Sequence, residues 1–512
     1  MPGTILDLLA RRAPGARAIG APAKGEAGQA WLDSAGLLGL VEETRAQLNA
    51  VGIGRGDRVA IVLPNGPEMA ACFIAVAAAC SAAPLNPAYR DEEFTFYLSD
   101  LKPKALLIQS GWDSPARAVA ARLGIPPIEL ATDPAMPAGR FRLDPSAMPE
   151  VAPSRPGPAS ADDEALVLHT SGTTARPKIV PLTGANLTAS ASHIGATLRL
   201  GPDDICFNIM PLFHIHGLIA ATLSSLAAGA SVACSSGFNA IRFLSQAEEV
   251  GATWYSAVPT MHQAILGRAE RERARARALG LRFIRSSSSS LPPQVMAALE
   301  EVFDAPVIES YGMTEAAHQM TSNPLPPAAR KPGSVGPAAG PEVAIMDEAG
   351  NLLSPGEEGE VVIRGPNVTK GYADNPEANA KSFTDGWFRT GDQGTLDEDG
   401  YLWLTGRLKE IINRGGEKIS PIEVDIVLMD HPAVAQVVTF ALAHSLLGEE
   451  VAAVVVLRDG LSVTEIEIRE FCSTRLAPFK IPRKVLFMEE IPKGATGKLQ
   501  RIGLARKLGL EG

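Results

Sequence analysis

The chain has 512 residues, of which 46% are hydrophobic and 20% are charged, and its formal net charge at pH 7 is −10. This length predicts two or more domains, and the composition is typical of a soluble globular protein. The acidic balance excludes nucleic acid as the main partner. The arginine-rich stretch 268–277 does not alter that conclusion, because its interleaved glutamates and alanines are typical of a solvated helix face.

The cysteines and the apolar runs indicate where the protein resides. The five cysteines have no paired metal spacing and lie mostly in apolar runs, so we expect buried free thiols in a reducing compartment. Arg11 and Arg12 follow the first apolar residues, which does not fit a secretory signal. The apolar run 69–79 is too short to span a bilayer. We therefore predict a cytoplasmic protein with no membrane partner.

Strand-like and helix-like runs alternate along the first 330 residues. Segments 58–63 and 104–108 are typical of buried strands, and an alanine-rich helix over 67–79 separates them. A Pro/Ala/Ser-rich linker, 148–162, precedes a further strand over 165–168. A second series then predicts helices over 184–198, 216–228 and 241–250 and strands over 204–210, 230–234 and 252–257. The alternation predicts a largely parallel α/β sheet.

The pattern changes from about Gly333 onward. Segments 342–346 and 358–364 are short, alternating and punctuated by glycine, as in a small antiparallel barrel. A compact α+β tail follows, with strands near 435–441 and 451–457 and a helix near 464–475. The predicted fold is therefore α/β, with a large N-terminal part of two α/β subdomains plus a small β-barrel, followed by a small α+β C-terminal part.

A hydroxyl-rich loop over 170–178 has the strongest chemical character. It places four hydroxyl side chains around Gly172 and ends on two cations, Arg176 and Lys178. Backbone N–H groups, hydroxyls and positive charge gathered at one point suit a polyphosphate. Such clusters are usually ordinary loops, but an ordinary loop does not need two cations closing it. The loop lacks the Gly-Lys-Ser/Thr ending of a Walker A motif.

Two further clusters supply imidazoles and hydroxyls. His214 and His216 are two residues apart and would share one face of a strand, which permits metal binding. Because no second Cys/His pair accompanies them, a pocket-lining histidine or a satisfied core histidine is favoured over a zinc site. The serine run 286–290 follows Arg285 and a buried-looking strand over 281–284, and ligands bind at the carboxyl ends of such strands.

Carboxylates and a lysine complete the candidate chemistry. Glu315 closes the segment 309–315 and is either an exposed loop residue or a hard oxygen ligand for Mg²⁺. Asp392 follows a glycine turn and either caps that turn or binds ribose hydroxyls. Lys498 ends a glycine-bracketed loop over 492–498, where the plain alternative is a solvated lysine.

Taken in this order, the motifs resemble the adenylate-forming superfamily of acyl-CoA synthetases, luciferases and peptide-synthetase adenylation domains. Segments 310–325 and 410–425 most resemble CoA ligases of the oxalate type. The resemblance implies an N-terminal adenylation domain over 1–407 and a mobile C-terminal domain over 408–512, with the hinge at Lys409.

The resemblance also implies ATP and Mg²⁺ as cofactors, and a first half-reaction in which the substrate carboxylate attacks the α-phosphorus of ATP. The implied nucleotide-binding residues are Thr170, Ser171, Gly172, Thr173, Thr174, Lys178, Ser289, Glu309, Ser310, Tyr311, Thr314, Asp392, Arg407 and Lys498. Within this set the loop holds the β- and γ-phosphates, Thr314 bonds to the α-phosphate and Tyr311 stacks on adenine. Asp392 and Arg407 hold the ribose. Lys498 bridges the carboxylate and the α-phosphate, and Glu315 binds Mg²⁺.

A second half-reaction, implied in the same way, transfers the acyl group to the thiol of coenzyme A. Rotation about Lys409 would remove Lys498 from the site and bring in the coenzyme A contacts Arg414, Gly415, Gly416 and Lys418. The sequence departs from the family at Ala175, where glycine is usual and where a positive φ would strain alanine.

The residues that line the acyl pocket by resemblance are His214, Ser288, Ser289 and His318. Imidazoles and hydroxyls suit a short polar acid whose second carboxylate must be paired when it is desolvated. Oxalate is therefore favoured, followed by malonate or another short dicarboxylate, and then by a coumarate-like aryl acid.

Two other activities stay open at this stage. One is an enzyme that loads a carrier protein instead of coenzyme A, and the other is a silent nucleotide-binding protein. Retention of Lys178, Glu315, Asp392, Arg407 and Lys498 argues against the silent protein. The expected partners are a small carboxylic acid, ATP and coenzyme A, and the expected assembly is a monomer or homodimer.

Overall fold

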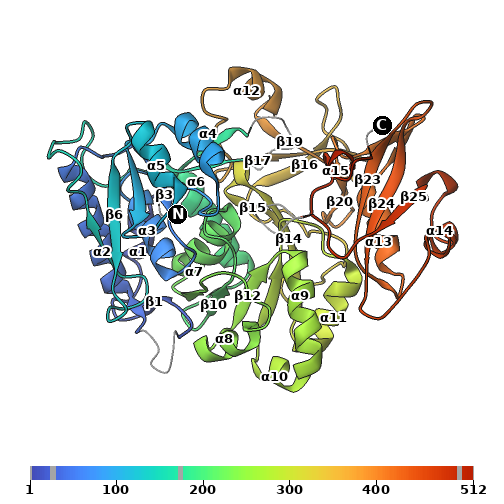
Figure 1. The fold of residues 1–512 in the computed structure, drawn as a ribbon, viewed down its shortest axis with the longest axis horizontal. Helices are drawn as coiled ribbons and strands as arrows, with labels where there is room; N and C mark the ends of the chain where they lie inside the picture. The colour runs from blue at the N-terminus through green and yellow to red at the C-terminus, as the bar shows by residue number, and fades with distance from the viewer. Residues whose placement is uncertain (1–2, 24–29, 171–176, 493–498, 511–512) are drawn as a thin grey trace.

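The computed structural model describes residues 3–23, 30–170, 177–492 and 499–510. Four sheets organise this part of the chain, and they have seven, eight, five and five strands. Figure 1 shows the two large sheets side by side in the blue and green-yellow parts of the chain, with the C-terminal sheet at the opposite end from the N-terminal strands. The predicted α/β class with a separate C-terminal α+β part is confirmed.

The seven-stranded sheet has the order β7-β6-β5-β3-β4-β8-β9 and is parallel from β6 to β8. Its strands are β3 (Arg58–Val62), β4 (Ser81–Pro84), β5 (Ala105–Gln109), β6 (Pro127–Thr132), β7 (Phe141–Asp144), β8 (Glu164–His169) and β9 (Ile179–Thr183). The accompanying helices are α2 (Ser34–Ala50), α3 (Pro67–Ala77), α4 (Asp91–Leu101) and α5 (Pro115–Arg122). Every residue of α3 except Glu68 is buried, because α3 contacts β4 and β8 of this sheet and β1 and β11 of the next.

The eight-stranded sheet has the order β15-β14-β13-β12-β10-β11-β1-β2, and only its two edge pairings are antiparallel. Its strands are β1 (Arg17–Gly20), β2 (Leu32–Asp33), β10 (Ile205–Asn208), β11 (Ser231–Cys234), β12 (Trp254–Ala257), β13 (Phe283–Ser286), β14 (Val307–Met313) and β15 (His318–Ser322). The helices around it are α1 (Ile5–Leu9), α6 (Gly184–Thr197), α8 (Phe243–Val250), α9 (Pro259–Ala269), η2 (Glu270–Glu272), α10 (Arg273–Ala278) and α11 (Pro293–Phe303). The predicted parallel α/β sheet is therefore confirmed.

The helix predicted over 216–228 has an unexpected beginning. It starts as a π-helix, η1 (His216–Leu223), and continues as α7 (Ser224–Ala227). The Thr222 hydroxyl and the Asn208 amide both donate to the carbonyl of Gly217, five residues before Thr222. A Cβ on Gly217 would lie 2.5 Å from the carbonyl oxygen of Pro211, so only glycine fits here. π-helical segments are frequent at functional sites, and this one begins at His216, one of the candidate residues.

The third sheet is antiparallel, and its strands are β16 (Glu342–Met346), β17 (Gly359–Arg364), β18 (Phe383–Thr384), β19 (Trp387–Leu396) and β20 (Leu402–Arg407). A short 3-10 turn, η3 (Thr314–Ala316), and the helix α12 (Pro376–Ser382) lie outside the sheets. β16 has the bounds that the glycine-punctuated pattern predicts. The antiparallel ladder between β19 and β20 matters for the site, because it pairs Asp392 with Arg407.

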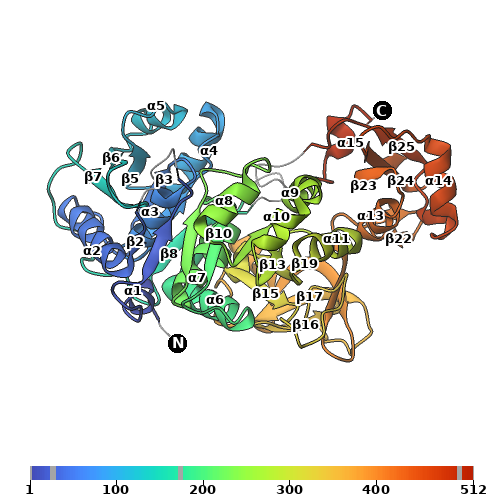
Figure 2. The same ribbon diagram turned by 90° about the horizontal axis from the view of Figure 1, so that it is seen from below.

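The fourth sheet forms the C-terminal part. Its elements are β21 (Ile412–Arg414), β22 (Glu417–Ile419), α13 (Pro421–Met429), β23 (Val434–His444), β24 (Gly448–Leu457), α14 (Glu465–Ser473), η4 (Pro478–Lys480), β25 (Lys484–Phe487) and α15 (Leu504–Lys507). The two strands and the helix predicted here are confirmed, and both strands are longer than predicted. In Figure 2 this part lies at one end of the molecule, beside α9 and α11. Side chains of Gln263 and Gln294 hydrogen bond to Ala435 and Asp430 across this junction.

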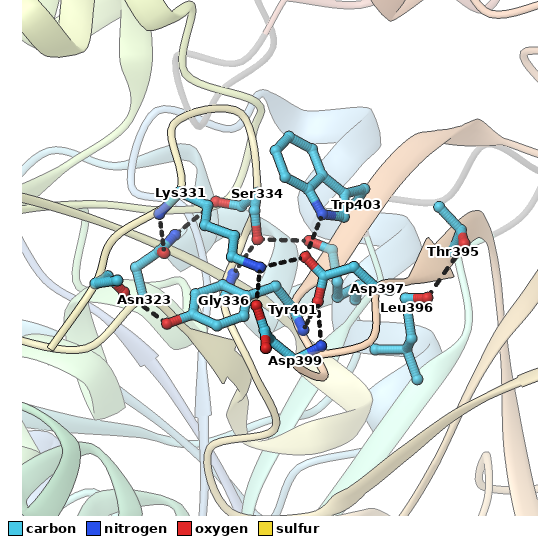
Figure 3. Close-up of polar contacts among 12 residues, drawn as sticks. Asn323, Lys331, Ser334, Gly336, Thr395, Leu396, Asp397, Asp399, Tyr401 and Trp403 are labelled. Atoms are coloured by element: carbon cyan, nitrogen blue, oxygen red, sulfur yellow. Dashed lines mark hydrogen bonds and ion pairs between the residues drawn. The ribbon is translucent and has the colours of Figure 1, made fainter. Parts of the chain in front are cut away.

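A polar cluster attaches the segment after β15 to the turn between β19 and β20 (Figure 3). Lys331 Nζ lies 2.7 Å from carboxylate oxygens of both Asp397 and Asp399, and Trp403 Nε1 donates to Asp397. The Ser334 hydroxyl donates to the carbonyl of Leu402 at 3.0 Å. The cluster fixes the third sheet against the second and so positions the hairpin that carries Asp392.

Two predictions about the composition can also be compared with the structure. All five cysteines are free and buried, as predicted. Within the described ranges no helix is both long enough and apolar enough to cross a membrane.

Candidate active site

The candidate site lies where the first three sheets meet. The segment 369–373 joins them, because Thr369 N donates to the carbonyl of Glu315 and Ala373 N donates to the carbonyl of Ile179. The parallel strands β12, β13 and β14 end at the same edge, which is where α/β sheets bind ligands.

The stem of the hydroxyl-rich loop is well defined. Thr170 N donates to the carbonyl of Lys178 at 2.9 Å, and Lys178 N donates to the Thr170 hydroxyl at 3.1 Å. The predicted phosphate ligands Ser171, Gly172, Thr173 and Thr174, together with Ala175, lie outside the described residues.

Lys178 and Glu315 are joined through an aromatic residue that the sequence did not single out. Tyr372 donates from its hydroxyl to Glu315 Oε1 at 2.8 Å, and the Lys178 ammonium lies 4.3 Å from the centre of its ring. Burial raises the pKa of Glu315, and the Tyr372 hydroxyl partly offsets that rise. Burial lowers the pKa of Lys178. Glu315 is thus buried and held in place, which removes the alternative of an exposed loop glutamate.

Tyr311, Asp392 and Arg407 form a second group. The Tyr311 hydroxyl donates to Asp392 Oδ2, and Arg407 Nε donates to Asp392 Oδ1 at 2.8 Å. The carboxylate is buried between them, and both its oxygens have a donor. The Thr390 hydroxyl accepts from Asp392 N at 3.1 Å, so Thr390 caps this turn and the Asp392 carboxylate instead accepts from Tyr311 and Arg407. The structure therefore brings together three of the residues predicted for adenine and ribose.

Glu309 and Ser310 lie behind this group and hold the serine loop. Glu309 Oε1 accepts from Leu291 N at 2.9 Å, and burial raises the pKa of Glu309 to about 8. The Ser310 hydroxyl donates to the carbonyl of Ser286 at 3.2 Å, and the Ser287 hydroxyl donates to the carbonyl of Ser310 at 3.0 Å. Thr314 begins η3 directly after β14.

The two histidines of the 211–217 segment do not lie on a strand. His214 is in the bend before η1 and His216 is its first residue, so the shared strand face that would permit metal binding is absent. No group of three potential metal ligands occurs among the described residues. The helix begins at His216, as predicted, and the carbonyl of His214 just before it accepts from Leu218 N.

His216, for which the sequence left a pocket-lining role and a core role open, is buried and contacts two serines. Its Nε2 lies 2.6 Å from the Ser256 hydroxyl and its Nδ1 lies 3.1 Å from the Ser288 hydroxyl. Its ring centre is 5.0 Å from that of His318, which is buried. Ser289 is exposed, and its hydroxyl donates to the carbonyl of Ser288.

The backbone around His318 is unusual. His318 has φ +101° and Ser288 has φ +76°, both in a region that non-glycine residues rarely adopt. A Cβ on Gly312 would lie 1.8 Å from the carbonyl oxygen of His318, so glycine is required for β15 to return this closely. The surrounding structure therefore holds both acyl-side residues in set positions.

The C-terminal candidates lie on exposed backbone. Lys409 is exposed, as are Gly415, Gly416 and Lys418. Gly415 has φ +61° and Gly416 has φ +98°, and no atom lies within 4 Å of a Cβ built on Gly416. Arg414 donates to Glu450 at 2.6 Å. Lys498 lies outside the described residues.

Buried charged side chains, the stem of the hydroxyl-rich loop and a cluster of polar side chains at the carboxyl ends of parallel strands lie together, as the resemblance to adenylate-forming enzymes implies. The model of the AMP-binding enzyme family matches residues 8–373, and the model of the AMP-binding enzyme C-terminal domain matches residues 423–498. The chain belongs to the AMP-binding enzyme family.

Individual relatives cover nearly the whole chain. An oxalate–CoA ligase from Arabidopsis thaliana is 47% identical, over 97% of this chain and 96% of the relative. An oxalate–CoA ligase from Saccharomyces cerevisiae is 44% identical, over 87% of this chain and 86% of the relative. The crystal structure of ATP-bound MatB from Rhodopseudomonas palustris is 30% identical and has a TM-score of 0.87, covering 100% of this chain and 98% of that chain.

Proposed function

We propose that the protein is an ATP-dependent acid–CoA ligase whose acid is oxalate. The observation that carries the choice of acid is the polar wall formed by the buried residues His216, Ser256 and His318 together with the partly buried Ser288. An apolar acyl chain would desolvate these groups without pairing them, whereas a second carboxylate accepts hydrogen bonds from them. The two oxalate–CoA ligase relatives support the same acid.

In the first half-reaction a carboxylate oxygen of the acid forms a bond to the α-phosphorus of ATP. The bond from that phosphorus to the bridging oxygen breaks, and pyrophosphate leaves. Lys178, which the loop stem fixes, holds the leaving phosphates, and Lys498 stabilises the charge at the α-phosphate. Asp392 and Arg407 hold the ribose, and Tyr311 adjoins them.

Glu315 fits a magnesium ligand. Its carboxylate is buried, one oxygen accepts from Tyr372, and hard oxygen ligands are those that Mg²⁺ prefers. The ion would supply charge neutralisation for the phosphates.

The second half-reaction uses the C-terminal part. We propose the domain division 1–407 and 408–512, with Lys409 as the hinge that exchanges Lys498 for Arg414, Gly415, Gly416 and Lys418. Gly415 and Gly416 are exposed and have positive φ, so the pantetheine arm of coenzyme A can pass close to their backbone. The five buried free thiols support a reducing, cytoplasmic location.

The test is release of AMP with a panel of acids, each with and without coenzyme A. Oxalate is expected to give AMP and oxalyl-CoA only when coenzyme A is present. Turnover of coumarate or octanoate beside no turnover of oxalate or malonate would contradict the polar-pocket assignment. Thioester formation on a carrier protein, with none on free coenzyme A, would show that the protein loads a carrier and is not a CoA ligase.

A further inference from the structure

Arg285 is a charged residue that the mechanism above does not use. It is completely buried, on β13, directly before the serine loop. In the parallel register, Arg285 is the partner of Ser256 on β12, and Ser256 is the partner of Asn208 on β10. These three side chains therefore lie on one face of the sheet, and η1 contacts that face.

Among the residues that the structure describes, no carboxylate pairs with the guanidinium of Arg285. Its contacts are to neutral oxygens at long range, 3.3 Å to Gln319 Oε1 and 3.5 Å to the Ser256 hydroxyl, and its Nε has no hydrogen-bond partner in the described part of the chain. Burial lowers the pKa of Arg285 to about 9, so the side chain still carries its charge at neutral pH. A buried charge without a partner is costly.

A second buried arginine shows what a structural role looks like in this protein. Arg12 donates to the carbonyl oxygens of Leu226 and Ala230 at 2.9 and 2.8 Å, and to the Ser34 hydroxyl at 2.9 Å. It also donates to the carbonyl of Arg17. Its donors are thus well satisfied at short distances. The donors of Arg285 are not satisfied in this way. Arg12 therefore has the contacts of an arginine that connects elements of the fold, whereas Arg285 has those of an arginine that awaits an anion.

Arg285 is continuous with the acyl side of the site. Ser256 contacts both the Arg285 guanidinium and His216 Nε2, and His216 contacts Ser288. Gln319, the other contact of Arg285, follows His318 directly. The guanidinium therefore belongs to the same polar network as the predicted acyl-pocket residues.

We propose that Arg285 is the counter-charge for the carboxylate of the acid that is not adenylated. A dicarboxylate keeps one carboxylate through both half-reactions, and this anion must be paired once it is desolvated. Gln319 and Ser256 act as positioning residues that orient the guanidinium. Gln319 is itself held by donating to Thr197 and Ala339, at 3.1 and 2.9 Å. The proposal rests on the proposed function and specifies its substrate class as short dicarboxylates.

The first test compares Arg285→Gln with the unchanged enzyme on oxalate, malonate and acetate, by AMP release. We expect kcat/KM for the dicarboxylates to fall about a hundredfold or more, mainly through KM, because one partner of a buried charge pair is removed. The KM for ATP and the rate with acetate should change less than about threefold. Arg285→Lys keeps a charge without the planar fork and should recover part of the loss.

Arg282→Gln is the matched control. Arg282 stands three residues earlier, is partly exposed and pairs with Asp204 at 2.9 Å. Its loss should leave the oxalate KM within about twofold. Loss of activity by the same factor on all three acids in Arg285→Gln, or an unchanged oxalate KM, would overturn the proposal.

A second pair of variants keeps Arg285 in place, so the proposal can still be tested if Arg285→Gln does not fold. Gln319→Glu puts a carboxylate against the guanidinium, where it competes with the substrate anion. Gln319→Leu loses the same donors to Thr197 and Ala339 without adding charge. We expect the oxalate KM to rise at least about tenfold more in Gln319→Glu than in Gln319→Leu. Equal oxalate KM values in the two folded variants would overturn the assignment.

The outcomes separate this proposal from the proposed function. If the unchanged enzyme uses oxalate or malonate and the Arg285→Gln variant uses them equally well, only the proposed role of Arg285 is contradicted. If the unchanged enzyme releases AMP only with monocarboxylic acids, both the proposed acid and the proposed role of Arg285 are contradicted.

Discussion

The nucleotide side and the acyl side of the site differ in how their charges are compensated. On the nucleotide side, Asp392 is paired with Arg407 and Tyr311, and Glu315 accepts from Tyr372. On the acyl side, Arg285 is buried, and its contacts within the described ranges are long ones to neutral oxygens. The nucleotide side is thus preorganised within the protein, whereas the acyl side has a charge that a substrate anion would complete.

The difference indicates how one fold serves many acids. In the proposed function the paired groups on the nucleotide side act on ATP whatever the acid, so we expect the effect of losing them to be the same for every acid. If Arg285 has the role proposed above, the buried cation on the acyl side discriminates between acids, because a monocarboxylate would leave it unpaired. The predictions below test that acid independence, from the largest expected effect to the smallest.

The largest effect is expected for Lys498→Ala. Removing the cation at the α-phosphate should slow adenylate formation by about a hundred- to a thousandfold, by the same factor for each acid. Thioester formation from a supplied acyl-adenylate should be spared, and single-turnover assays of the two steps measure this. Equal loss of both steps would contradict the exchange of Lys498 for the coenzyme A contacts.

Asp392→Asn should follow. The substitution keeps the shape of a buried side chain and removes the charge that Arg407 and Tyr311 share. The KM for ATP should rise about ten- to a hundredfold, the range for hydrogen bonds to a charged group. Steady-state kinetics with oxalate and malonate measure it, with Asp397→Asn on the same strand-turn as the control. A rise in the KM for ATP with only one of the two acids would contradict the separation of nucleotide binding from acid binding.

Tyr372→Phe isolates one hydroxyl. The ring under Lys178 stays, but Glu315 loses its donor at 2.8 Å, so its carboxylate is less well held and harder to ionise. The Mg²⁺ concentration for half-maximal adenylation should rise about tenfold. Tyr401→Phe, which loses a hydrogen bond to Ala329 far from Glu315, is the control and should not shift the titration. The same Mg²⁺ requirement in both variants would argue against Glu315 as the metal ligand.

The smallest effect concerns stability and not catalysis. Hydrogen bonding and charge from Lys331 lower the pKa of Asp397 to about 2, below the value of about 3.9 for an unfolded aspartate. A depressed pKa contributes stability above the unfolded value, and that contribution is lost as the pH falls through the range from about 4 to 2. Asp397→Asn should therefore lower the denaturation midpoint at pH 7.

Chemical denaturation at pH 7, 5, 4 and 3 measures the midpoint difference between Asp397→Asn and the unchanged protein. The difference should shrink below about pH 4, while kcat/KM at pH 7 stays within about twofold for both acids. A difference that grows on acidification would show that Asp397 is protonated in the fold.

Much of the fold and of the nucleotide side could be predicted from local sequence. Apolar runs such as 58–63 and 104–108 give buried strands because parallel strands are covered on both faces. The charges of Asp392 and Arg407 follow from their residue types, so the sequence alone could mark them as candidates. Tyr372 could not be found in this way, because an aromatic residue 57 positions from Glu315 meets it only when the segment 369–373 crosses between sheets.

By itself the sequence determined the α/β order of elements and the resemblance that places the chain among adenylate-forming enzymes, and it singled out the hydroxyl-rich loop. It left His216 undecided and gave Arg285 no role. Only the tertiary structure decided which side chains surround these two residues, because parallel register aligns Arg285 with Ser256 from a strand 29 residues earlier, and η1 brings His216 onto that row. Whether a buried charge has a partner depends on the side chains that surround it in space, and these come from strands, helices and turns far apart in the chain.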